Sequence, residues 1–325
     1  MNVVDVSVII VNWNTRDILR DCLMSVYEQT QNISFEVIVI DNASSDGSAA
    51  MVKKEFTQVI LIENSENRGF AAANNQGIAV AKSRYVLLLN SDTIILDDVI
   101  KKTVLFADAH REAAVVGCRV LNADKTLQQT CFMFPSVLNM LLAATYLYKL
   151  FPRNRFFGRE RMTRWNRNSV SEVDVVTGCF MLVRREAIEQ IGLMDERFFV
   201  YGEETDWCYR FKKNGWKIMF TPDGQIIHYG GQTTRQMARK FRLQVLGSQL
   251  IFMKLHRGKL SFLLARLLTA LSLFIRVPYW LVTAVLHKSE RRKSMETAGT
   301  YLIGGFYCLV GWKNLLMNKN SVKTP

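Results

Sequence analysis

Val37-Ile38-Val39-Ile40 runs directly into Asp41-Asn42-Ala43-Ser44-Ser45-Asp46-Gly47-Ser48, so a short apolar segment ends in an acidic turn. A continuous apolar run is typical of a buried parallel strand, and the ligands of open α/β sheets bind beyond the carboxyl ends of such strands. We therefore predict that Asp41 lies at the mouth of a cleft. The polar side chains that can cap the following helix are those of Ser44, Ser45 and Asp46.

The same pattern recurs at two other predicted strands. The run at residues 6–11 ends in Asn12-Trp13-Asn14, and the run at 85–89 ends in Asn90-Ser91-Asp92. A further apolar run at 59–62 and a helical segment at 97–109 continue the alternation over the first 120 residues. Alternating strands and helices predict an α/β fold with a mostly parallel, Rossmann-like sheet and helices on both faces. Three strands that deliver polar clusters to one edge of this sheet favour a nucleotide site.

Residues 130–170 interrupt the alternation. The apolar segment 139–151 predicts a helix, and residues 149–167 contain seven Lys and Arg but Glu160 as their one acidic residue. Such a charged run indicates either a solvated surface segment or a flap over a bound acceptor. Strands are expected again at 173–183, 216–220 and 226–228, the last two separated by a turn at Pro222-Asp223-Gly224.

The positive charge of the chain is concentrated in its tail. The 325 residues carry a net charge of +13, yet residues 233–325 hold 16 Lys and Arg against 2 Asp and Glu, while residues 1–232 hold 26 against 27. The tail also contains the longest apolar stretches, and this combination favours an anionic membrane surface as a partner. No nucleic-acid-binding motif accompanies the charge, so no nucleic-acid partner is expected.

The tail segment at residues 260–286 is long enough to span a bilayer, which takes about 20 residues. Pro278 predicts a kink in it, and its polar residues share one helical face: Lys259, Arg266, Thr269, Ser272, Arg276 and Thr283. With the basic residues between 288 and 293, this stripe favours a helix that lies in the membrane interface. Insertion across the bilayer and burial against another protein are the alternatives. The apolar residues 301–312 fit the same layer.

Two features bear on the cellular compartment. The six cysteines show neither metal-binding nor redox spacing, which indicates buried free thiols in a reducing compartment. No basic segment precedes the first apolar run, so no signal peptide is expected. We therefore expect the catalytic part on the cytoplasmic face of the membrane.

Seven motifs, in this order, resemble those of the family 2 glycosyltransferases, inverting enzymes with the GT-A fold, and within them the rhamnosyltransferase-like branch. The motifs lie at residues 8–14, 41–48, 67–75, 88–92, 177–185, 198–210 and 228–231. The resemblance implies a GT-A catalytic domain at residues 1–234. Residues 235–325 then form a basic and apolar helical tail for membrane association.

The resemblance implies a single in-line displacement at the anomeric carbon of the donor sugar. Such a reaction needs a base for the acceptor hydroxyl and a cation for the departing diphosphate, but no protein nucleophile. Glu204 matches the position of the base, which is usually Asp in the family. Glu203 and Asp206 compete for this role, and the whole acidic cluster also suits the start of a helix. Candidates for contacting the acceptor or supporting the site are Asp195 and Trp207.

Asp92 matches the last acid of the family's metal motif, often Asp-x-Asp, although Asn90 stands at its first position. His228 matches a histidine that completes the metal shell in some members. Together with diphosphate and water, one carboxylate and one imidazole can hold a divalent cation, Mn or Mg. Without the resemblance, Asn90-Ser91-Asp92 would indicate only a turn and a helix cap.

Asp41 corresponds to the residue that accepts the imide N–H shared by uracil and thymine, which favours UDP- or dTDP-sugars. Further nucleotide contacts implied by the resemblance are Asn12, Arg68, Gly69 and Ser91. A surface cation is the alternative for Arg68. Gly69 allows close approach of backbone to ligand, and the helix that follows it offers its N-terminus to phosphate. The branch implies dTDP-rhamnose as the first candidate donor and a lipid-linked glycan of a cell-surface polysaccharide as the acceptor.

Three other classes of protein share some of these features. Processive synthases carry a Gln-x-x-Arg-Trp signature, whereas here Gln236 follows Gln232-Thr233-Thr234-Arg235. Nucleotidyltransferases typically have a Gly-rich, basic loop after the first strand, which Asn12-Trp13-Asn14-Thr15 is not. A catalytically silent, nucleotide-sugar-binding scaffold at the membrane stays open, because Asn90 and Glu204 depart from the commonest motifs.

Overall fold

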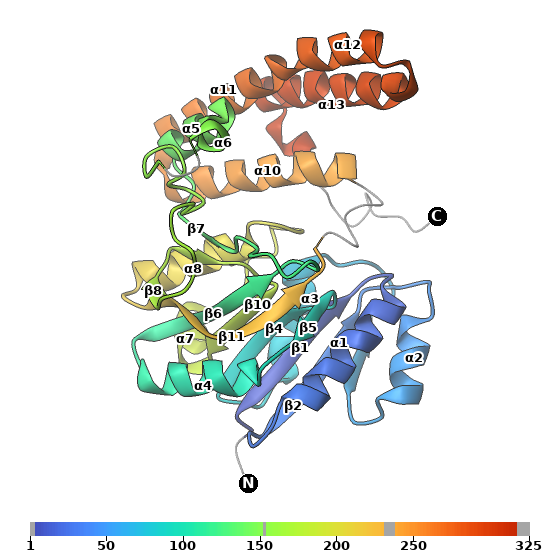
Figure 1. The fold of residues 1–325 in the computed structure, drawn as a ribbon, viewed down its shortest axis with the longest axis vertical. Helices are drawn as coiled ribbons and strands as arrows, with labels where there is room; N and C mark the ends of the chain where they lie inside the picture. Colours follow the sequence, from blue (N-terminus) through green and yellow to red (C-terminus); the bar gives the residue numbers. More distant parts are fainter. Residues whose placement is uncertain (1–3, 152–153, 231–237, 317–325) are drawn as a thin grey trace.

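The computed structural model describes residues 4–151, 154–230 and 238–316. A sheet with helices on both faces carries a second, helical layer above one of its edges (Figure 1). Two features discussed above lie outside the described residues. They are the segment 232–236, which lacks the signature of processive synthases, and the predicted domain boundary at residue 234.

The first half of the sheet is parallel, as the apolar runs predicted. Its strands lie in the order β3 (Ile60–Glu63), β2 (Phe35–Asp41), β1 (Val6–Asn12) and β4 (Tyr85–Asn90). Asn12 pairs with Asp41 at the end of the β1–β2 register, so the polar clusters that follow both strands lie at the same edge of the sheet.

The second half of the sheet is mixed. β10 (Phe180–Arg184) runs antiparallel to both β4 and β6 (Ala113–Leu121). β11 (Lys217–His228) runs parallel to β6 and antiparallel to β5 (Thr93–Ile95) and β8 (Ser171–Glu172). Because β5 follows β4 directly, the β5–β11 pair brings the polar turn after β4 beside the end of β11.

Two predicted strand regions take a different form. The strands expected at 216–220 and 226–228 are one strand, β11, because a bulge absorbs the turn where its register against β6 shifts between Phe220 and Gln225. The strand expected at 173–183 is divided into β9 (Val175–Val176) and β10. β9 pairs with β7 (Cys131–Phe132) in a separate two-stranded sheet.

Helices cover both faces of the sheet because the side chains of its strands alternate. Val8 and Ile10 belong to one core cluster and Ile9 to the other, and all three are fully buried. The first cluster is covered by α1 (Arg16–Gln29), α2 (Ser48–Glu55) and α4 (Val99–Ala109). The second is covered by α3 (Phe70–Val80), α7 (Arg185–Ile191) and α8 (Glu203–Lys213).

The turn after β2 both starts α2 and contacts the loop after β1. Asp46 Oδ1 accepts the backbone N–H of Ser48 at 3.0 Å, as expected of a residue at a helix start, although Gly47 with φ +83° occupies the N-cap position. Ser44 Oγ instead accepts the backbone N–H of Asn14 at 2.9 Å. The serine thereby ties the loop after β1 to the loop after β2, at the edge where the site lies.

The helical layer stands on α10 (Ala238–His256), which lies between the sheet and the remaining helices (Figure 1). Above it, α11 and α12 pack along α13, and α5 packs on α11. The buried core runs from α8 through Phe252 of α10 into α11 and α13 without interruption. The other elements are α5 (Val137–Thr145), α6 (Leu147–Leu150), α11 (Gly258–Phe274), α12 (Arg276–Leu286), η1 (Lys288–Glu290), α13 (Arg291–Val310) and η2 (Trp312–Leu315).

The long apolar helix is interrupted where the proline predicts a kink. α11 ends at Phe274 and α12 begins at Arg276. Pro278 lacks an N–H, and its ring crowds the carbonyl four residues earlier, which is that of Phe274. The helix predicted at 139–151 is interrupted as well, because Tyr146 adopts a left-handed conformation with φ +56° between α5 and α6.

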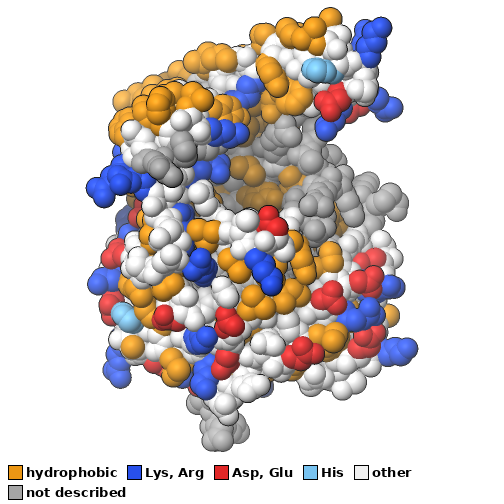
Figure 2. All heavy atoms as spheres, in the orientation of Figure 1, with side chains coloured by type: hydrophobic (Ala, Val, Ile, Leu, Met, Phe, Trp, Pro, Cys, Tyr) orange, Lys and Arg blue, Asp and Glu red, His pale blue; other side chains and the backbone are white. Residues whose placement is uncertain are grey.

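The middle of the polar stripe, from Arg266 to Arg276, faces protein, whereas Lys259 at its start is exposed. Arg266 donates to the carbonyl of Cys308 at 2.7 Å and to that of Leu309, so it caps the C-terminus of α13. Thr269 is buried, and Arg276 donates to the carbonyl of Ala144 at 3.5 Å. The exposed face of these helices is therefore the apolar one, and Figure 2 shows apolar side chains gathered over the helical layer.

Candidate active site

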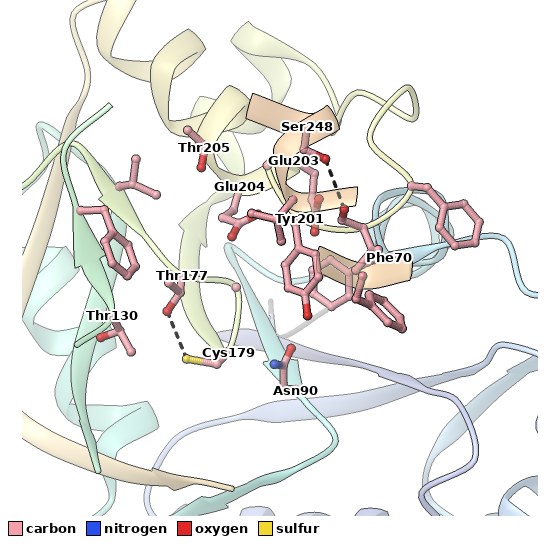
Figure 3. Close-up of a pocket in the computed structure, with 18 of the residues that line it drawn as sticks. Phe70, Asn90, Thr130, Thr177, Cys179, Tyr201, Glu203, Glu204, Thr205 and Ser248 are labelled. Carbon is pink, nitrogen blue, oxygen red and sulfur yellow. Dashed lines mark hydrogen bonds between the residues drawn. The ribbon is translucent and has the colours of Figure 1, made fainter. Parts of the chain in front are cut away.

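A cavity of about 550 Å³ opens at the carboxyl ends of the strands, beneath α10 (Figure 3). Its walls come from the turn after β4, the end of β11, the start of α8, the segment around β7 and one side of α10. Of the predicted site residues, the following line it: Gly69, Ser91, Asp92, Glu203, Glu204 and His228.

The turn after β4 and the end of β11 form the candidate cation site. Asp92 Oδ1 lies 3.2 Å from His228 Nε2, and Asn90 Nδ2 lies 3.3 Å from the same nitrogen. A separation of about 3 Å suits two neighbouring ligands on one octahedral cation with bonds of about 2.1 Å. In the described part of the chain, no three His, Cys, Asp or Glu side chains gather into a metal site. The donor set thus fits a cation that takes its other ligands from diphosphate and water.

Glu203 and Glu204 stand in the first turn of α8 and reach into the cavity (Figure 3). Glu203 is 3% exposed, and within the described structure the Oε2 atoms of both side chains have no hydrogen-bond partner. Burial raises the pKa of both carboxyl groups, and for Glu203 the neighbouring charge of Glu204 adds to this effect. A raised pKa brings a carboxylate closer to the range in which it works as a general base at neutral pH.

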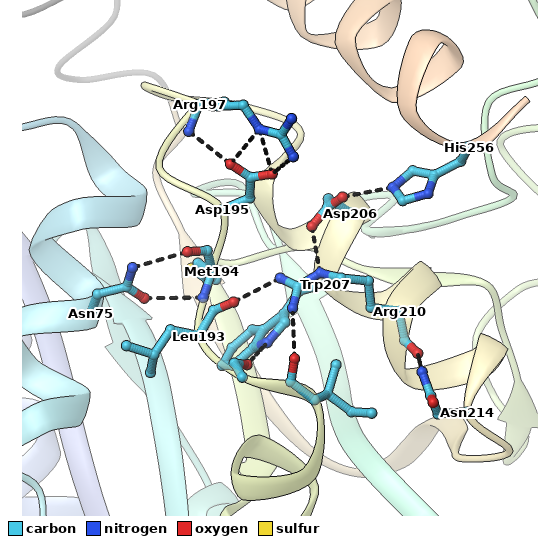
Figure 4. Close-up of polar contacts among 12 residues, drawn as sticks. Asn75, Leu193, Met194, Asp195, Arg197, Asp206, Trp207, Arg210, Asn214 and His256 are labelled. Atoms are coloured by element: carbon cyan, nitrogen blue, oxygen red, sulfur yellow. Dashed lines mark hydrogen bonds and ion pairs between the residues drawn. The ribbon is translucent and has the colours of Figure 1, made fainter. Parts of the chain in front are cut away.

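Asp206, Trp207 and Asp195 lie outside the cavity lining. They make polar contacts with other protein groups instead (Figure 4). Asp206 accepts from Arg210 Nε and from His256 Nε2, both at 2.7 Å. Trp207 is fully buried and donates from Nε1 to the carbonyl of Gly192 at 2.9 Å. Asp195 is paired with Arg197. Of the three acids that competed for the role of base, the geometry therefore leaves Glu203 and Glu204 at the cavity.

The predicted nucleotide residues are divided between the cavity lining and the layer behind it. Asp41 is 4% exposed and accepts from Asn12 Nδ2 at 3.0 Å and from the backbone N–H of Ser44 at 2.9 Å. Neither Asp41 nor Asn12 is part of the cavity lining, and the side chain of Arg68 is exposed outside it. Each oxygen of Asp41 keeps a lone pair for a further donor.

Asn42 holds the Gly69 loop at the cavity and was not recognised in the sequence. Its Nδ2 donates to the carbonyl of Gly69 at 3.1 Å, and its Oδ1 accepts the backbone N–H of Arg68 at 3.0 Å. Gly69 has φ +84°, and a Cβ there would overlap the carbonyl of Phe199. This close approach explains why glycine stands in front of α3.

The sequence of residues 7–192 matches the family model described as glycosyl transferase family 2. This chain belongs to glycosyltransferase family 2. Among curated relatives, the N-acetylglucosaminyl-diphospho-decaprenol L-rhamnosyltransferase of Mycobacterium tuberculosis is 26% identical over 209 residues, which are 61% of this chain and 67% of that protein. The O-antigen biosynthesis protein RfbC of Myxococcus xanthus is 26% identical over 232 residues, which are 71% of this chain but only 18% of RfbC. The glycosyltransferase is thus rhamnosyltransferase-like, as its motifs indicated.

A solved structure confirms the predicted GT-A fold. The mannosyltransferase PcManGT of Pyrobaculum calidifontis, in complex with GDP-Man and Mn²⁺, has a TM-score of 0.57 to this glycosyltransferase at 18% identity. The likeness covers 95% of this chain and 88% of that one, so it includes both the sheet and the helical layer.

The first tail helix of the glycosyltransferase forms one wall of the cavity, which the sequence did not predict. Gln244 Nε2 and Ser248 Oγ both donate to the carbonyl of Val200, at 3.0 and 3.4 Å. The α10 side chains that line the cavity are Phe241, Val245, Ser248, Gln249 and Phe252. The one feature of the sequence that could have indicated this wall is the spacing of Gln244 and Ser248, two polar residues four positions apart in a basic and apolar helix. Both are buried in the structure.

Other ionisable residues also line the cavity of the glycosyltransferase, among them Cys179 and Glu160. Burial raises the pKa of the Cys179 thiol to about 12, so the thiol stays protonated and is a poor nucleophile. Burial also raises the pKa of Glu160, which belongs to the basic segment predicted as a surface run or a flap. That segment is organised by Arg167, which is 1% exposed and donates to the carbonyls of Arg161 and Met162, each at 2.8 Å.

Proposed function

We propose that this glycosyltransferase transfers one sugar, with inversion, from a UDP- or dTDP-sugar to a lipid-linked glycan during synthesis of a cell-surface polysaccharide. The observation that carries the proposal is the meeting of Glu204 with Asp92 and His228 in one cavity. These residues come from three separate elements and supply the two functions that an inverting transfer needs, a base and a place for a cation.

Glu204 acts as the base. Its carboxylate takes the proton of the acceptor hydroxyl while the hydroxyl oxygen attacks the anomeric carbon, and the bond from that carbon to the diphosphate oxygen breaks. Asp92 and His228 hold a divalent cation, Mn or Mg, which when bound neutralises charge on the departing diphosphate. The protein forms no covalent intermediate, in keeping with the high pKa of the Cys179 thiol in the same cavity.

The donor is assigned to the edge formed by β1, β2 and β4. Asp41, oriented by Asn12, offers an acceptor to the imide N–H of uracil or thymine, and Gly69 and Ser91 lie at the phosphates. dTDP-rhamnose is the first candidate, because a relative is named an L-rhamnosyltransferase. The solved relative PcManGT holds GDP-Man with Mn²⁺, so the guanine nucleotide belongs in the test beside the pyrimidines.

The acceptor arrives from a membrane to which the helical layer binds. Residues Gly258–Leu286 are the one part of the described chain long and apolar enough to cross a membrane by length and composition. One side of this segment packs on α13 and α5 through Arg266 and Arg276, so only its other side is left to contact lipid. We therefore place it in the plane of the membrane surface and not across the bilayer. The side chains exposed for insertion include Leu260, Leu271, Ile275, Val285, Phe306 and Val310.

The catalytic unit extends through α10. A domain that ended at residue 234 would lose the cavity wall made by Phe241 and Phe252 and the hydrogen bonds of Gln244 and Ser248 to Val200. We therefore place the functional boundary after His256. Removal of residues 241–325 would release the protein from membranes but would also open its active site.

Calorimetric binding of UDP, dTDP and GDP, with and without Mn²⁺, tests the donor assignment. We expect Mn²⁺-dependent binding of UDP or dTDP that Asp92→Ala weakens and that Glu204→Gln leaves unchanged. Folded protein that binds none of the three nucleotides would contradict the donor site. The alternative is a catalytically silent, nucleotide-sugar-binding scaffold, which the departures of Asn90 and Glu204 from the commonest motifs allow. Such a protein would bind nucleotide but transfer no sugar, and Glu204→Gln would leave its function unchanged.

A further inference from the structure

Gln128 holds the imidazole of His228 from the side opposite Asp92. His228 Nδ1 lies 2.7 Å from Gln128 Oε1. Gln128 Nε2 donates to the backbone carbonyl of His228 at 3.1 Å and to Asn122 Oδ1 at 2.8 Å. A backbone carbonyl can only accept, so the NH₂ group of Gln128 faces it and the amide oxygen faces the ring. Nδ1 of His228 therefore carries the proton in this arrangement.

The hydrogen bonds continue from Gln128 to the surface in one direction. Asn122 Nδ2 donates to Thr126 Oγ1 at 2.9 Å, and the hydroxyl of Thr126 donates to Asp124 Oδ1 at 2.6 Å. The Thr126 hydroxyl holds the pKa of Asp124 below its usual value, so this carboxylate is ionised and only accepts. Because Asp124 can only accept, each hydrogen bond from Thr126 back through Asn122 and Gln128 has a fixed direction, and the chain ends with Gln128 Oε1 as the acceptor for the imidazole.

A short hairpin after β6 places these residues. The backbone N–H of Asn122 donates to the carbonyl of Thr126 at 2.8 Å, and that of Gln128 donates to the carbonyl of Val120 at 2.9 Å. Lys125, with φ +65°, occupies the tip of the turn and has no part in the chain of hydrogen bonds. The hairpin therefore holds Gln128 by its own backbone hydrogen bonds at the wall of the cavity.

The proton on Nδ1 leaves Nε2 of the neutral ring with a lone pair, and that nitrogen lies 3.2 Å from Asp92 Oδ1 and 3.3 Å from Asn90 Nδ2, whose N–H it can accept when no cation is bound. Two acceptors that face each other at this distance attract a cation between them. If Nε2 were protonated instead, it would donate a hydrogen bond to Asp92. Neither the imidazole nor that carboxylate oxygen could then bind a cation without breaking this bond. The tautomer of His228 thus decides whether this pair of side chains is free to bind a metal ion.

We propose that Gln128, supported by Asn122, Thr126 and Asp124, is a positioning residue that fixes His228 as the Nδ1–H tautomer and so directs the Nε2 lone pair to the cation site beside Asp92. This inference rests on the cation site of the proposed function. Residues that orient a metal-binding histidine in this way typically contribute about 10–100-fold to metal affinity.

The experiment compares the wild-type protein with Gln128→Met, which keeps the length of the side chain and removes its three hydrogen bonds, to the imidazole and the carbonyl of His228 and to Asn122. Histidine-selective ¹⁵N labelling with long-range ¹H–¹⁵N spectra of metal-free protein identifies the tautomer, since the chain has only four histidines and His228→Ala assigns the signal. Titration with Mn²⁺ alone, followed by the electron paramagnetic resonance of the free ion, gives the affinity. Lys125→Asn is the matched control in the same hairpin.

We expect the Nδ1–H tautomer in the wild-type protein, a shift toward Nε2–H in Gln128→Met, and an Mn²⁺ affinity about 10–100-fold lower in that variant. If Gln128→Met does not fold, Thr126→Val should change both readouts in the same direction by a smaller amount. An Nε2–H tautomer in the wild-type protein, or unchanged Mn²⁺ affinity in folded Gln128→Met, would overturn the role of Gln128. A wild-type protein with the Nδ1–H tautomer that binds Mn²⁺ neither alone nor together with UDP or dTDP would refute the cation site of the proposed function instead.

Discussion

His256 Nε2 donates to Asp206 Oδ1 over 2.7 Å and so joins the first helix of the tail to the helix that carries Glu204 (Figure 4). The carboxylate is 1% exposed and also accepts from Arg210, whose guanidinium donates to the carbonyls of Ile191 and Leu193. The position of α10 above the cavity is thereby coupled to the position of α8 within it.

The first prediction concerns this bond. We expect His256→Ala to lower the free energy of unfolding by about 1.5–3 kcal/mol, because it removes a hydrogen bond to a buried charged group. Urea denaturation of the full chain measures the change. His287→Ala, at an exposed position just after α12, is the matched control and should leave stability unchanged. Equal stability of the two variants would contradict a structural role for His256.

The second prediction concerns catalysis by Glu204. We expect Glu204→Gln to reduce kcat by about 10²–10⁴-fold while nucleotide binding stays near that of the wild-type protein. Because burial raises the pKa of Glu204 and the base must be ionised, the rate of the wild-type enzyme should fall with decreasing pH at a higher pH than for an ordinary glutamate. Glu189→Gln is the control, since its carboxylate is exposed on α7 outside the cavity lining, and it should keep full activity. Full activity of Glu204→Gln would remove this residue from the mechanism.

The third prediction uses the burial of Glu203. Its pKa is raised in the folded protein, so the folded state binds a proton more tightly than the unfolded state does. The resulting stabilisation is present below the unfolded pKa and is lost as the pH rises through the folded value. Glu203→Gln, which carries no titratable group, should therefore gain stability relative to the wild-type protein as the pH increases from 5 to 8.5. Urea denaturation across this range checks it, and a constant difference would show that Glu203 is not buried as a carboxylic acid.

The sequence predicted the parallel half of the sheet and the edge that carries the site. Both follow from local pattern, since continuous apolar runs such as 37–40 identify buried strands and polar residues such as Asp41 mark their ends. The resemblance supplied the order of the motifs, and the β5–β11 pairing brings together Asp92 and His228, which lie 136 positions apart in the sequence.

Other parts of the site could not be predicted because they depend on tertiary contacts. The periodicity of the tail shows that Arg266 and Arg276 share a face, but it cannot tell whether that face meets water or the carbonyls of another helix. The cavity wall made by α10 could not be predicted for the same reason, because it depends on the hydrogen bond from Gln244 to the carbonyl of Val200, 44 positions away. Gln128 belongs to no recognisable sequence motif. Its proposed role follows only from the hydrogen bond that its amide makes with His228 in the folded protein.

The fourth prediction tests the membrane-binding face. We expect the combined substitutions Leu267→Gln, Leu271→Gln and Val285→Gln to weaken binding to anionic vesicles at least about tenfold, because full burial of each such side chain contributes about 1.5–3 kcal/mol. The three residues are 47%, 54% and 77% exposed on α11 and α12. Cosedimentation with vesicles measures the change.

The control for this face carries three equivalent changes on the sheet domain, at apolar residues of similar exposure: Met24→Gln, Val80→Gln and Leu105→Gln. It should sediment as the wild-type protein does. Replacing the exposed basic residues Arg291, Arg292 and Lys293 by Gln should weaken binding to anionic but not to neutral vesicles, by about 1 kcal/mol for each charge. If the apolar substitutions leave sedimentation unchanged while the basic ones abolish it, the protein would be held by charge alone and the apolar face would have to meet another protein.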